Sequence, residues 1–333
     1  MNRPGRRKML QGALAWAGFG LLPGCDMRGE QASKVRRIGF LAVGSREGRA
    51  FLIEGLLRGL REHGYVEGQN LVIEYRFSED RDDRLAELAS ELVNLKVELI
   101  VASGTPASFA AKQATSTIPL VMGGVAANPV ETGLVASLAH PGGNVTGMSM
   151  MTSQLGGKRL ELFKEIVPGI SRIAVLWNPT NLSYGPVLRE LDAAAQTLHL
   201  KVQRVEVRAP ADLEGAFAAT AAKAGALIVP ADPLTTNRQK VIADLALKHR
   251  VPTIMEYKEF VKAGGLVSLG VDLVDLYRRS ASHVDKILKG ANPGDLPMEQ
   301  PTKLDLYVNL KTARAMGLTL PKSVLLQATE VLE

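Results

Sequence analysis

Cysteine is almost absent from this chain, which has one, Cys25, among 333 residues. A single cysteine excludes an intrachain disulfide and any zinc or iron–sulfur site built from several thiolates. Aromatic residues are also few, at 5%, whereas hydrophobic residues make up 46% and charged residues 22%. This balance is typical of a globular protein rather than a disordered or fibrous one. The length suggests about two domains, at roughly 100–200 residues each.

Signatures of catalysis and nucleotide binding are missing as well. No G-x-G-x-x-G follows an expected strand, and Gly44–Gly48 lacks that spacing, so we expect no dinucleotide site. The chain contains neither a G-x-x-x-x-G-K-[ST] phosphate loop nor a G-x-S-x-G nucleophile elbow. Its five histidines are scattered and do not form the spacings of metal ligands. We therefore expect no catalytic residue, no metal site and no cofactor.

Excess positive charge is confined to the start of the chain. The net charge is +6, but residues 1–24 contain four basic side chains and no acidic one. The rest of the chain therefore has a net charge of only about +2, which gives no reason to expect a nucleic-acid partner.

The first 25 residues have the pattern of an export signal. Arg6, Arg7 and Lys8 precede an uncharged stretch, 9–22, that rises only about 21 Å as a helix, short of a bilayer core of roughly 30 Å. A buried N-terminal helix is the alternative. Residues 22–25 resemble a bacterial lipobox, although its proline is unusual, so we expect Cys25 to be the lipidation site of an anchored form. The arginine pair resembles a twin-arginine motif imperfectly, which leaves the export route open. No other apolar run approaches 18 residues.

Strands and helices are expected to alternate from Arg36 onward. Short apolar runs are followed by apolar residues at helical spacing, as from Ile53 and from Leu85, which predicts a mainly parallel sheet covered on both faces. The same order recurs in the second half. We therefore expect an α/β fold of two doubly wound, Rossmann-like lobes joined by a multi-strand hinge. The expected strands are 38–43, 70–77, 99–102, 119–122, 173–177, 226–229 and 251–255.

Turn-rich segments at His140–Asn144 and at 290–301 divide the chain. We expect hinge strands near 145–150, 268–272 and 301–304. The expected domains are an export signal (1–25), a linker (26–35), a first lobe (36–148 with about 273–303), a second lobe (149–272) and a C-terminal strand and helices (304–333) whose lobe is left open.

Small polar residues follow several expected strands, where parallel sheets bind ligands. Thr105, which we expect to cap a helix before Pro106, would receive an anionic group with the neighbouring backbone amides. Asp232 would face an ammonium group. For each residue a plain helix cap or loop bond is the alternative, and Trp177 is either a stacking platform or a core residue. The candidate ligand-binding residues from strand ends are Ser45, Ser103, Thr105, Asn178, Asp232 and Tyr257.

A family resemblance is carried by the segments 55–65, 101–107, 140–147, 158–162, 263–266, 308–313 and 317–321. From about Arg36 to Glu333 the chain resembles the ABC-transporter substrate-binding proteins found beside tryptophan and tyrosine transport genes, a branch of the type I periplasmic-binding fold. Two positions depart from the family pattern. Asn128 stands where the family has Asp before Pro-Val, and Leu269 stands where it has Tyr. Both changes would alter how an ammonium or a ring is held, and Asn128 joins the candidate ligand-binding residues.

The resemblance implies a receptor in the periplasm or on the outer face of the cytoplasmic membrane. It would close around a small polar solute, with an amino acid as one candidate, and deliver it to an ABC permease in the inner membrane. It would act as a monomer that contacts the membrane only through a lipid anchor. The alternatives are a sensory binding protein, an exported enzyme, and a transcriptional regulator, which would need a helix-turn-helix where the export signal lies.

Overall fold

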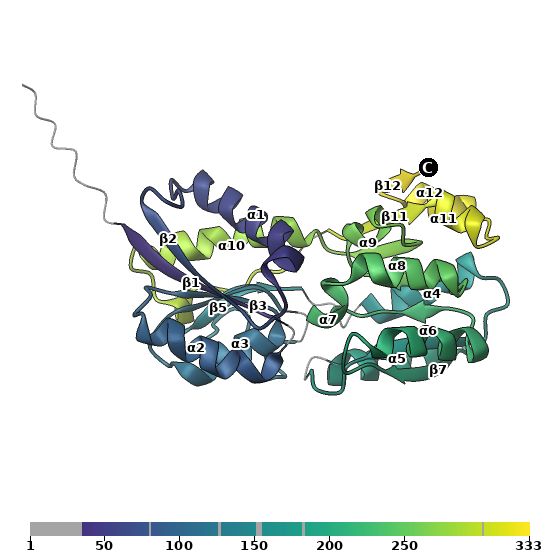
Figure 1. The fold of residues 1–333 in the computed structure, drawn as a ribbon, viewed down its shortest axis with the longest axis horizontal. Coiled ribbons are helices and arrows are strands. Elements are labelled where there is room, and N and C mark those ends of the chain that lie inside the picture. The colour runs from purple at the N-terminus through teal and green to yellow at the C-terminus, as the bar shows by residue number, and fades with distance from the viewer. Residues whose placement is uncertain (1–34, 80, 126–127, 151–154, 182–183, 302) are drawn as a thin grey trace, which may run out of the picture. The chain divides into compact units, whose positions relative to one another are not determined.

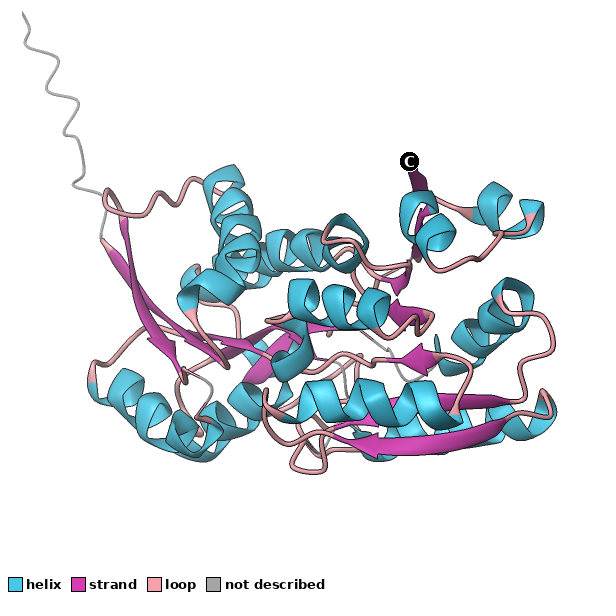
Figure 2. Cartoon of the chain, turned by 45° about the vertical axis from the view of Figure 1, so that its right-hand side comes forward, coloured by secondary structure: helices cyan, strands magenta, loops and turns pink. Residues whose placement is uncertain are grey.

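The computed structural model describes residues 35–333, except 80, 126–127, 151–154, 182–183 and 302. The expected export signal, its Cys25 and linker residues 26–34 lie outside the described residues. The described part contains two sheets, each with helices on both faces (Figures 1 and 2). No helix in this part is both long enough and apolar enough to cross a bilayer.

The first sheet has five parallel strands in the order β2-β1-β3-β4-β5, an order of the doubly wound kind. Its strands are β1 (Arg36–Ala42), β2 (Leu71–Phe77), β3 (Ile100–Ser103), β4 (Leu120–Val125) and β5 (Val145–Ser149). Its helices are α1 (Arg46–Glu62), α2 (Leu85–Asn94), α3 (Thr105–Ala114) and α10 (Leu273–Leu288), with short 3₁₀ turns at Asp82–Arg84 and Pro293–Asp295.

Strand β1 shows why this sheet is buried on both faces. Ile38 and Phe40 belong to the core under α1 and α10, whereas Leu41 belongs to the core under α2 and α3. A continuous apolar run therefore serves two cores, as expected for a central parallel strand. A Cβ at Gly59 would lie only 2.0 Å from the Arg278 carbonyl oxygen, so the glycine allows helices α1 and α10 to pack closely.

The second sheet has seven strands in the order β12-β11-β10-β9-β8-β6-β7, and only the β10–β11 pair is antiparallel. Its strands are β6 (Arg172–Trp177), β7 (Lys201–Glu206), β8 (Leu227–Ile228), β9 (Thr253–Met255), β10 (Val267–Gly270), β11 (Asp305–Asn309) and β12 (Glu330–Leu332). Its helices are α4 (Gly156–Ile166), α5 (Tyr184–Thr197), α6 (Asp212–Lys223), α7 (Pro233–Thr236), α8 (Gln239–Lys248), α9 (Lys258–Lys262), α11 (Leu310–Ala315) and α12 (Lys322–Gln327).

We call the five-stranded sheet with its helices the first lobe, and the seven-stranded sheet with its helices the second lobe. The chain passes between them three times: from β5 to α4, from β10 to α10, and from the segment around Glu299 to β11. Glu299 belongs to the first lobe at this point, because it forms an isolated β-bridge with Met148 of β5. The C-terminal strands β11 and β12 belong to the second sheet. The expected fold class, α/β with two doubly wound lobes, is confirmed.

The ends of two helices bear on local expectations from the sequence. Gly64 ends α1 in the left-handed region at φ 86, and Tyr65 N–H donates to the Leu60 carbonyl at 2.9 Å, as expected of a helix stop. The expectation that Thr105 caps α3 was wrong. The cap is Gly104 at φ 94, and Thr105 is the first helical residue. Trp177 is half-buried against the core of the second lobe, which agrees with the second of its two expected roles, that of a core residue.

Candidate functional site

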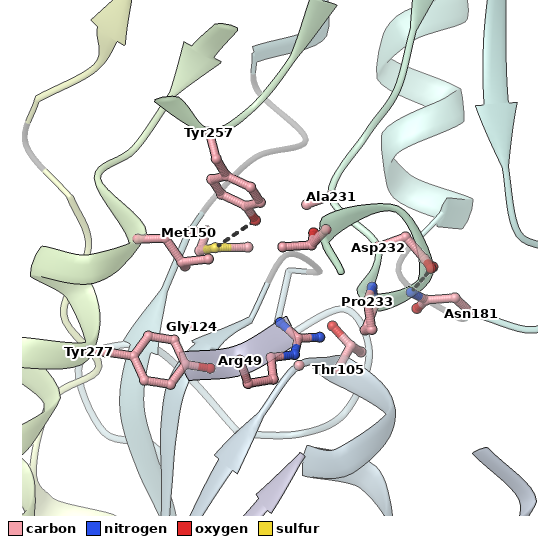
Figure 3. A pocket seen from close by; sticks show the side chains of 13 residues that line it. Arg49, Thr105, Gly124, Met150, Asn181, Ala231, Asp232, Pro233, Tyr257 and Tyr277 are labelled. Atoms are coloured by element: carbon pink, nitrogen blue, oxygen red, sulfur yellow. Dashed lines mark hydrogen bonds between the residues drawn. The ribbon is translucent and has the colours of Figure 1, made fainter. Parts of the chain in front are cut away.

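A narrow cavity lies where strands of both sheets end (Figure 3). Thr105 follows β3, Met150 follows β5, Asp232 follows β8 and Tyr257 follows β9, which is the edge where open parallel sheets bind ligands. The volume is about 30 Å³, room for about one or two water molecules. The lining residues are Arg49, Gly104, Thr105, Gly124, Met150, Asn181, Ala231, Asp232, Pro233, Thr236, Tyr257, Leu273 and Tyr277.

Arg49 brings a positive charge to this cavity from the first lobe. It lies one turn into α1 and is only 3% exposed. Its Nε donates to the Val43 carbonyl at 3.0 Å, but its buried Nη2 finds no partner among the described residues. Burial lowers the pKa of Arg49, yet a guanidinium keeps its proton at neutral pH. Figure 3 shows the guanidinium between Tyr277 and Thr105. The site therefore contains a buried cation with an unused donor, the state in which an anion is most favourable.

Asp232 brings a negative charge to the cavity from the second lobe. It follows β8 and caps α7, because its Oδ1 accepts a hydrogen bond from Leu234 N–H at 2.8 Å. Its Oδ2 accepts from Asn181 Nδ2 at 2.7 Å. Burial raises the pKa of Asp232, while these hydrogen bonds and the charge of Arg49 act in the opposite direction. The two lobes thus present opposite charges to one small space.

Aromatic and apolar groups form the rest of the wall. Tyr277 donates its hydroxyl to Ser103 Oγ at 2.6 Å, which holds the ring in place. The Tyr257 hydroxyl reaches only Met150 Sδ, at 3.5 Å, and sulfur is a weak acceptor. Burial raises the pKa of both tyrosines, so both hydroxyls stay protonated. Leu273 completes the wall. This part of the site suits a ring or another large apolar group.

The structure brings some of the expected site residues to the cavity and leaves others away from it. Thr105, Asp232 and Tyr257 line it, and Ser103 lies directly behind Tyr277. Ser45 does not line the cavity. Its hydroxyl instead caps α1 by accepting a hydrogen bond from Gly48 N–H.

Two further candidates do not line the cavity. Asn178 lines a neighbouring pocket of about 180 Å³ and accepts from the Thr180 hydroxyl at 2.7 Å, but its side chain also lies next to Asp232 and helps to lower the pKa of that carboxyl. Asn128 closes a local turn with Val130 N–H and donates to Glu131 at 3.2 Å. Among the residues that the structure describes, no three His, Cys, Asp or Glu side chains are placed to hold a metal ion.

Reasoning from strand ends missed Arg49 and Tyr277, because both residues lie inside helices. A signal for Arg49 was present in the sequence. Arg49, Leu52, Ile53 and Leu56 recur at i, i+3, i+4 and i+7, so a charged side chain stands on the buried face of α1. Charged side chains are rarely buried without a partner, and such a position marks a functional candidate.

Comparison with known proteins places the chain in a clear context. A family model described as "ABC transporter substrate binding protein" matches residues 37–332. The tyrosine-binding protein of Clostridioides difficile (strain R20291) is 29% identical over 265 residues, which cover 80% of this chain and 76% of that protein.

Two solved structures extend this comparison. The ABC domain from Streptococcus pneumonia in complex with L-Trp is 28% identical, covers 89% of this chain and 99% of its own, and superposes with a TM-score of 0.83. The ligand-free, open structure of a substrate binding protein with adhesive properties from Clostridium difficile is 25% identical, covers 90% and 99%, and gives 0.64. The chain described here therefore superposes better on the L-Trp complex than on the open, ligand-free protein.

Proposed function

Because this chain belongs to the ABC transporter substrate-binding protein family, we propose that it is the solute receptor of an ABC importer and binds an aromatic amino acid between its lobes. The observation that carries this proposal is the pair of buried opposite charges, Arg49 and Asp232, on opposite lobes of one cavity. A zwitterion matches such a pair, because each of its two charged groups can bind the protein group of opposite charge in place of the water that it loses on binding.

The carboxylate of the amino acid would bind to the first lobe. Nη2 of Arg49 is a buried donor there that has no partner in the described part of the chain. Helix α3 begins at Thr105, which lines the same cavity, so its hydroxyl and the N–H groups of the first turn, apart from Pro106, which has none, would bind the same carboxylate. The ammonium group would bind to Asp232 on the second lobe, whose carboxylate can accept further hydrogen bonds besides those from Asn181 and Leu234.

The side chain of the amino acid would lie against Tyr257, Tyr277, Met150 and Leu273. Aromatic rings pair favourably with other rings, and thioethers contact rings well. Relatives named for binding tyrosine and solved with L-Trp support a ring-bearing ligand.

The lobes must separate to admit the solute, and the side chains that line the cavity must move apart around it when the lobes close again, because about 30 Å³ is too small for an amino acid. The three chain crossings are the proposed hinge. One of them is braced by an ion pair of 2.6 Å between Lys258 of α9 and Asp272, the residue that caps α10.

We place this receptor outside the cytoplasmic membrane, as a monomer whose partner is an ABC permease in the inner membrane. Export would depend on residues 1–25, and Cys25 would carry the lipid anchor. In the native host, Cys25→Ser should move the protein from the membrane to the soluble fraction. Unchanged membrane fractionation would rule out the anchor.

Titration calorimetry tests the proposed ligand. L-tryptophan and L-tyrosine should bind, while tryptamine, which lacks the carboxylate, and indole-3-propionate, which lacks the ammonium, should each bind about 10- to 150-fold more weakly. Equal affinity for tryptophan and both analogues would refute the zwitterion site. Failure of every L-amino acid to bind would refute the ligand class.

A further inference from the structure

The second lobe touches the first through a segment that approaches three glycines. This segment contains the short helix α7 and Asn237, the residue that caps the C-terminus of α7. A Cβ added at Gly44 would lie 1.8 Å from Asn237 Nδ2, and one at Gly48 would lie 3.2 Å from Asn237 Cγ. A Cβ at Gly104 would lie 3.2 Å from Pro233 Cγ. The absence of side chains at these glycines therefore permits the contact between the lobes.

Asn237 does not line the cavity, so it would not touch the proposed solute. The residue is half-buried, but its Nδ2 and Oδ1 atoms are both buried, and neither has a hydrogen-bond partner among the described residues. An unpaired buried amide is unfavourable compared with the same amide in water. When the lobes separate, the glycines move away and water can reach both atoms. The contact thus combines a close steric fit with a polar group that favours opening.

We propose that Asn237 and the facing glycines Gly44 and Gly48 set the balance between open and closed lobes, and so tune affinity without touching the solute. The proposal rests on the proposed function, in which the lobes close around a ligand. The same segment carries Asp232, so docking of Asn237 on the glycines brings the ammonium-binding carboxylate into place. The unpaired amide keeps the empty protein from remaining closed, because apparent affinity scales with the population of the competent state.

Gly48→Ala is the most informative substitution. Gly48 lies inside α1 with a helical backbone, so alanine should raise the melting temperature of the free protein. The same methyl group crowds Asn237 only when the lobes are closed, so solute affinity should fall about 10-fold. Asn237→Ala should have the opposite effect, with more closed protein in the absence of solute and tighter binding. In the Asn237→Ala background most of the loss caused by Gly48→Ala should disappear, because two of its three crowding atoms are gone.

Gly215→Ala is the matched control, since Gly215 also lies in a helix, α6, and a Cβ there would meet no atom of the described residues within 4 Å. It should raise the melting temperature without changing affinity. The balance of open and closed lobes is measured without any solute, by electron–electron double resonance between one spin label on each lobe in a Cys25→Ser background. Gly48→Ala should lengthen the mean distance and Asn237→Ala should shorten it.

Each outcome decides one of the two ideas. If Gly48→Ala and Gly215→Ala give the same distances, or if Asn237→Ala does not shorten them, the proposed balance is refuted whatever the protein binds. If the distances shift as expected while no amino acid binds by calorimetry, the balance stands and the proposed ligand fails.

Discussion

In the first lobe the charge that reaches the cavity is a cation on a helix, Arg49 of α1, and in the second lobe it is an anion at a strand end, Asp232 after β8. The two groups also differ in what already surrounds them. Asp232 accepts hydrogen bonds from Asn181 and Leu234, whereas Arg49 Nη2 has no partner among the residues that the structure describes. A ligand carboxylate would therefore provide an acceptor for a buried donor that lacks one, while a ligand ammonium would join a carboxylate that already has hydrogen bonds. The first lobe should contribute the larger share of affinity.

Arg49→Met should weaken binding more than any other substitution considered, because it removes the group from which the first lobe derives its larger share of the affinity. It removes the buried cation, so affinity for the amino acid should fall about 100-fold or more by calorimetry. The melting temperature of the free protein should stay the same or rise, because an apolar side chain replaces a buried charge. Arg46→Met is the control, since Arg46 is exposed on the same helix and lies over the Tyr75 ring. Equal losses in both variants would mean that Arg49 is not the carboxylate partner.

Asp232→Asn should weaken binding by a smaller factor, about 10- to 30-fold, since asparagine keeps an oxygen that can cap α7 but loses the charge. Asp212→Asn serves as control, because Asp212 is an exposed carboxylate that accepts from Arg208 and Ala209 N–H at the start of α6. It should leave affinity unchanged. A loss at Asp232 that exceeds the loss at Arg49 would reverse the ranking of the lobes.

Lowering the pH should weaken the contribution of the second lobe to binding, because that lobe binds the ammonium group through a carboxylate. The pKa of Asp232 is raised above its ordinary value of 3.8 by burial, so it takes up a proton while ordinary aspartates are still ionised. Affinity should therefore fall as the pH drops through this raised pKa. The contribution of Asp232 to stability has the opposite sign: it is greatest below the unfolded pKa and is lost as the pH rises through the folded pKa. Calorimetry from pH 7 to pH 4 should show this fall in the parent protein and a flatter profile in Asp232→Asn, and parallel profiles would exclude Asp232 as the titrating group.

Thr105→Val should have the smallest effect, about 5-fold, because it removes one neutral hydroxyl while the amides of α3 remain. Thr197→Val, at the exposed C-terminal residue of α5 and outside the cavity, is the control and should leave affinity unaltered. If Thr105→Val matched the loss at Arg49, the hydroxyl rather than the guanidinium would be the main anion donor of the first lobe.

The periodicity of apolar residues was sufficient to predict most of the sheet-forming segments. The expected strand 70–77 and the observed β2 differ by one residue, and the expected 173–177 and the observed β6 likewise. Agreement was poorer at β8, where the expected 226–229 shortens to Leu227–Ile228. Burial pattern depends on side chains, but strand ends depend on backbone pairing with neighbours that a local pattern does not contain.

The strand-end rule predicted Thr105, Asp232 and Tyr257 at the cavity for a physical reason. All three follow parallel strands, and the carboxyl ends of parallel strands share one edge of a sheet. The rule also proposed Ser45, which instead caps a helix, because a hydroxyl near helix N–H groups satisfies them first. Asn128 was proposed from family likeness and lies in its own turn, where an asparagine side chain bonds to backbone two residues onward.

The sequence by itself determined the alternation of strands and helices, the two-lobed plan and the polar character of the strand ends, because these follow from local periodicity and from the residues that turns and caps require. Only the tertiary structure decided which side chains meet. Tyr277 reaches Ser103 across 174 positions of sequence, and Asn237 docks on Gly44 and Gly48 from the other lobe. Such contacts depend on how two separately wound sheets face each other, and no local pattern encodes that arrangement. The pairing of Arg49 with Asp232 across one cavity belongs to the same class, since opposite charges on different lobes become a site only when the lobes approach.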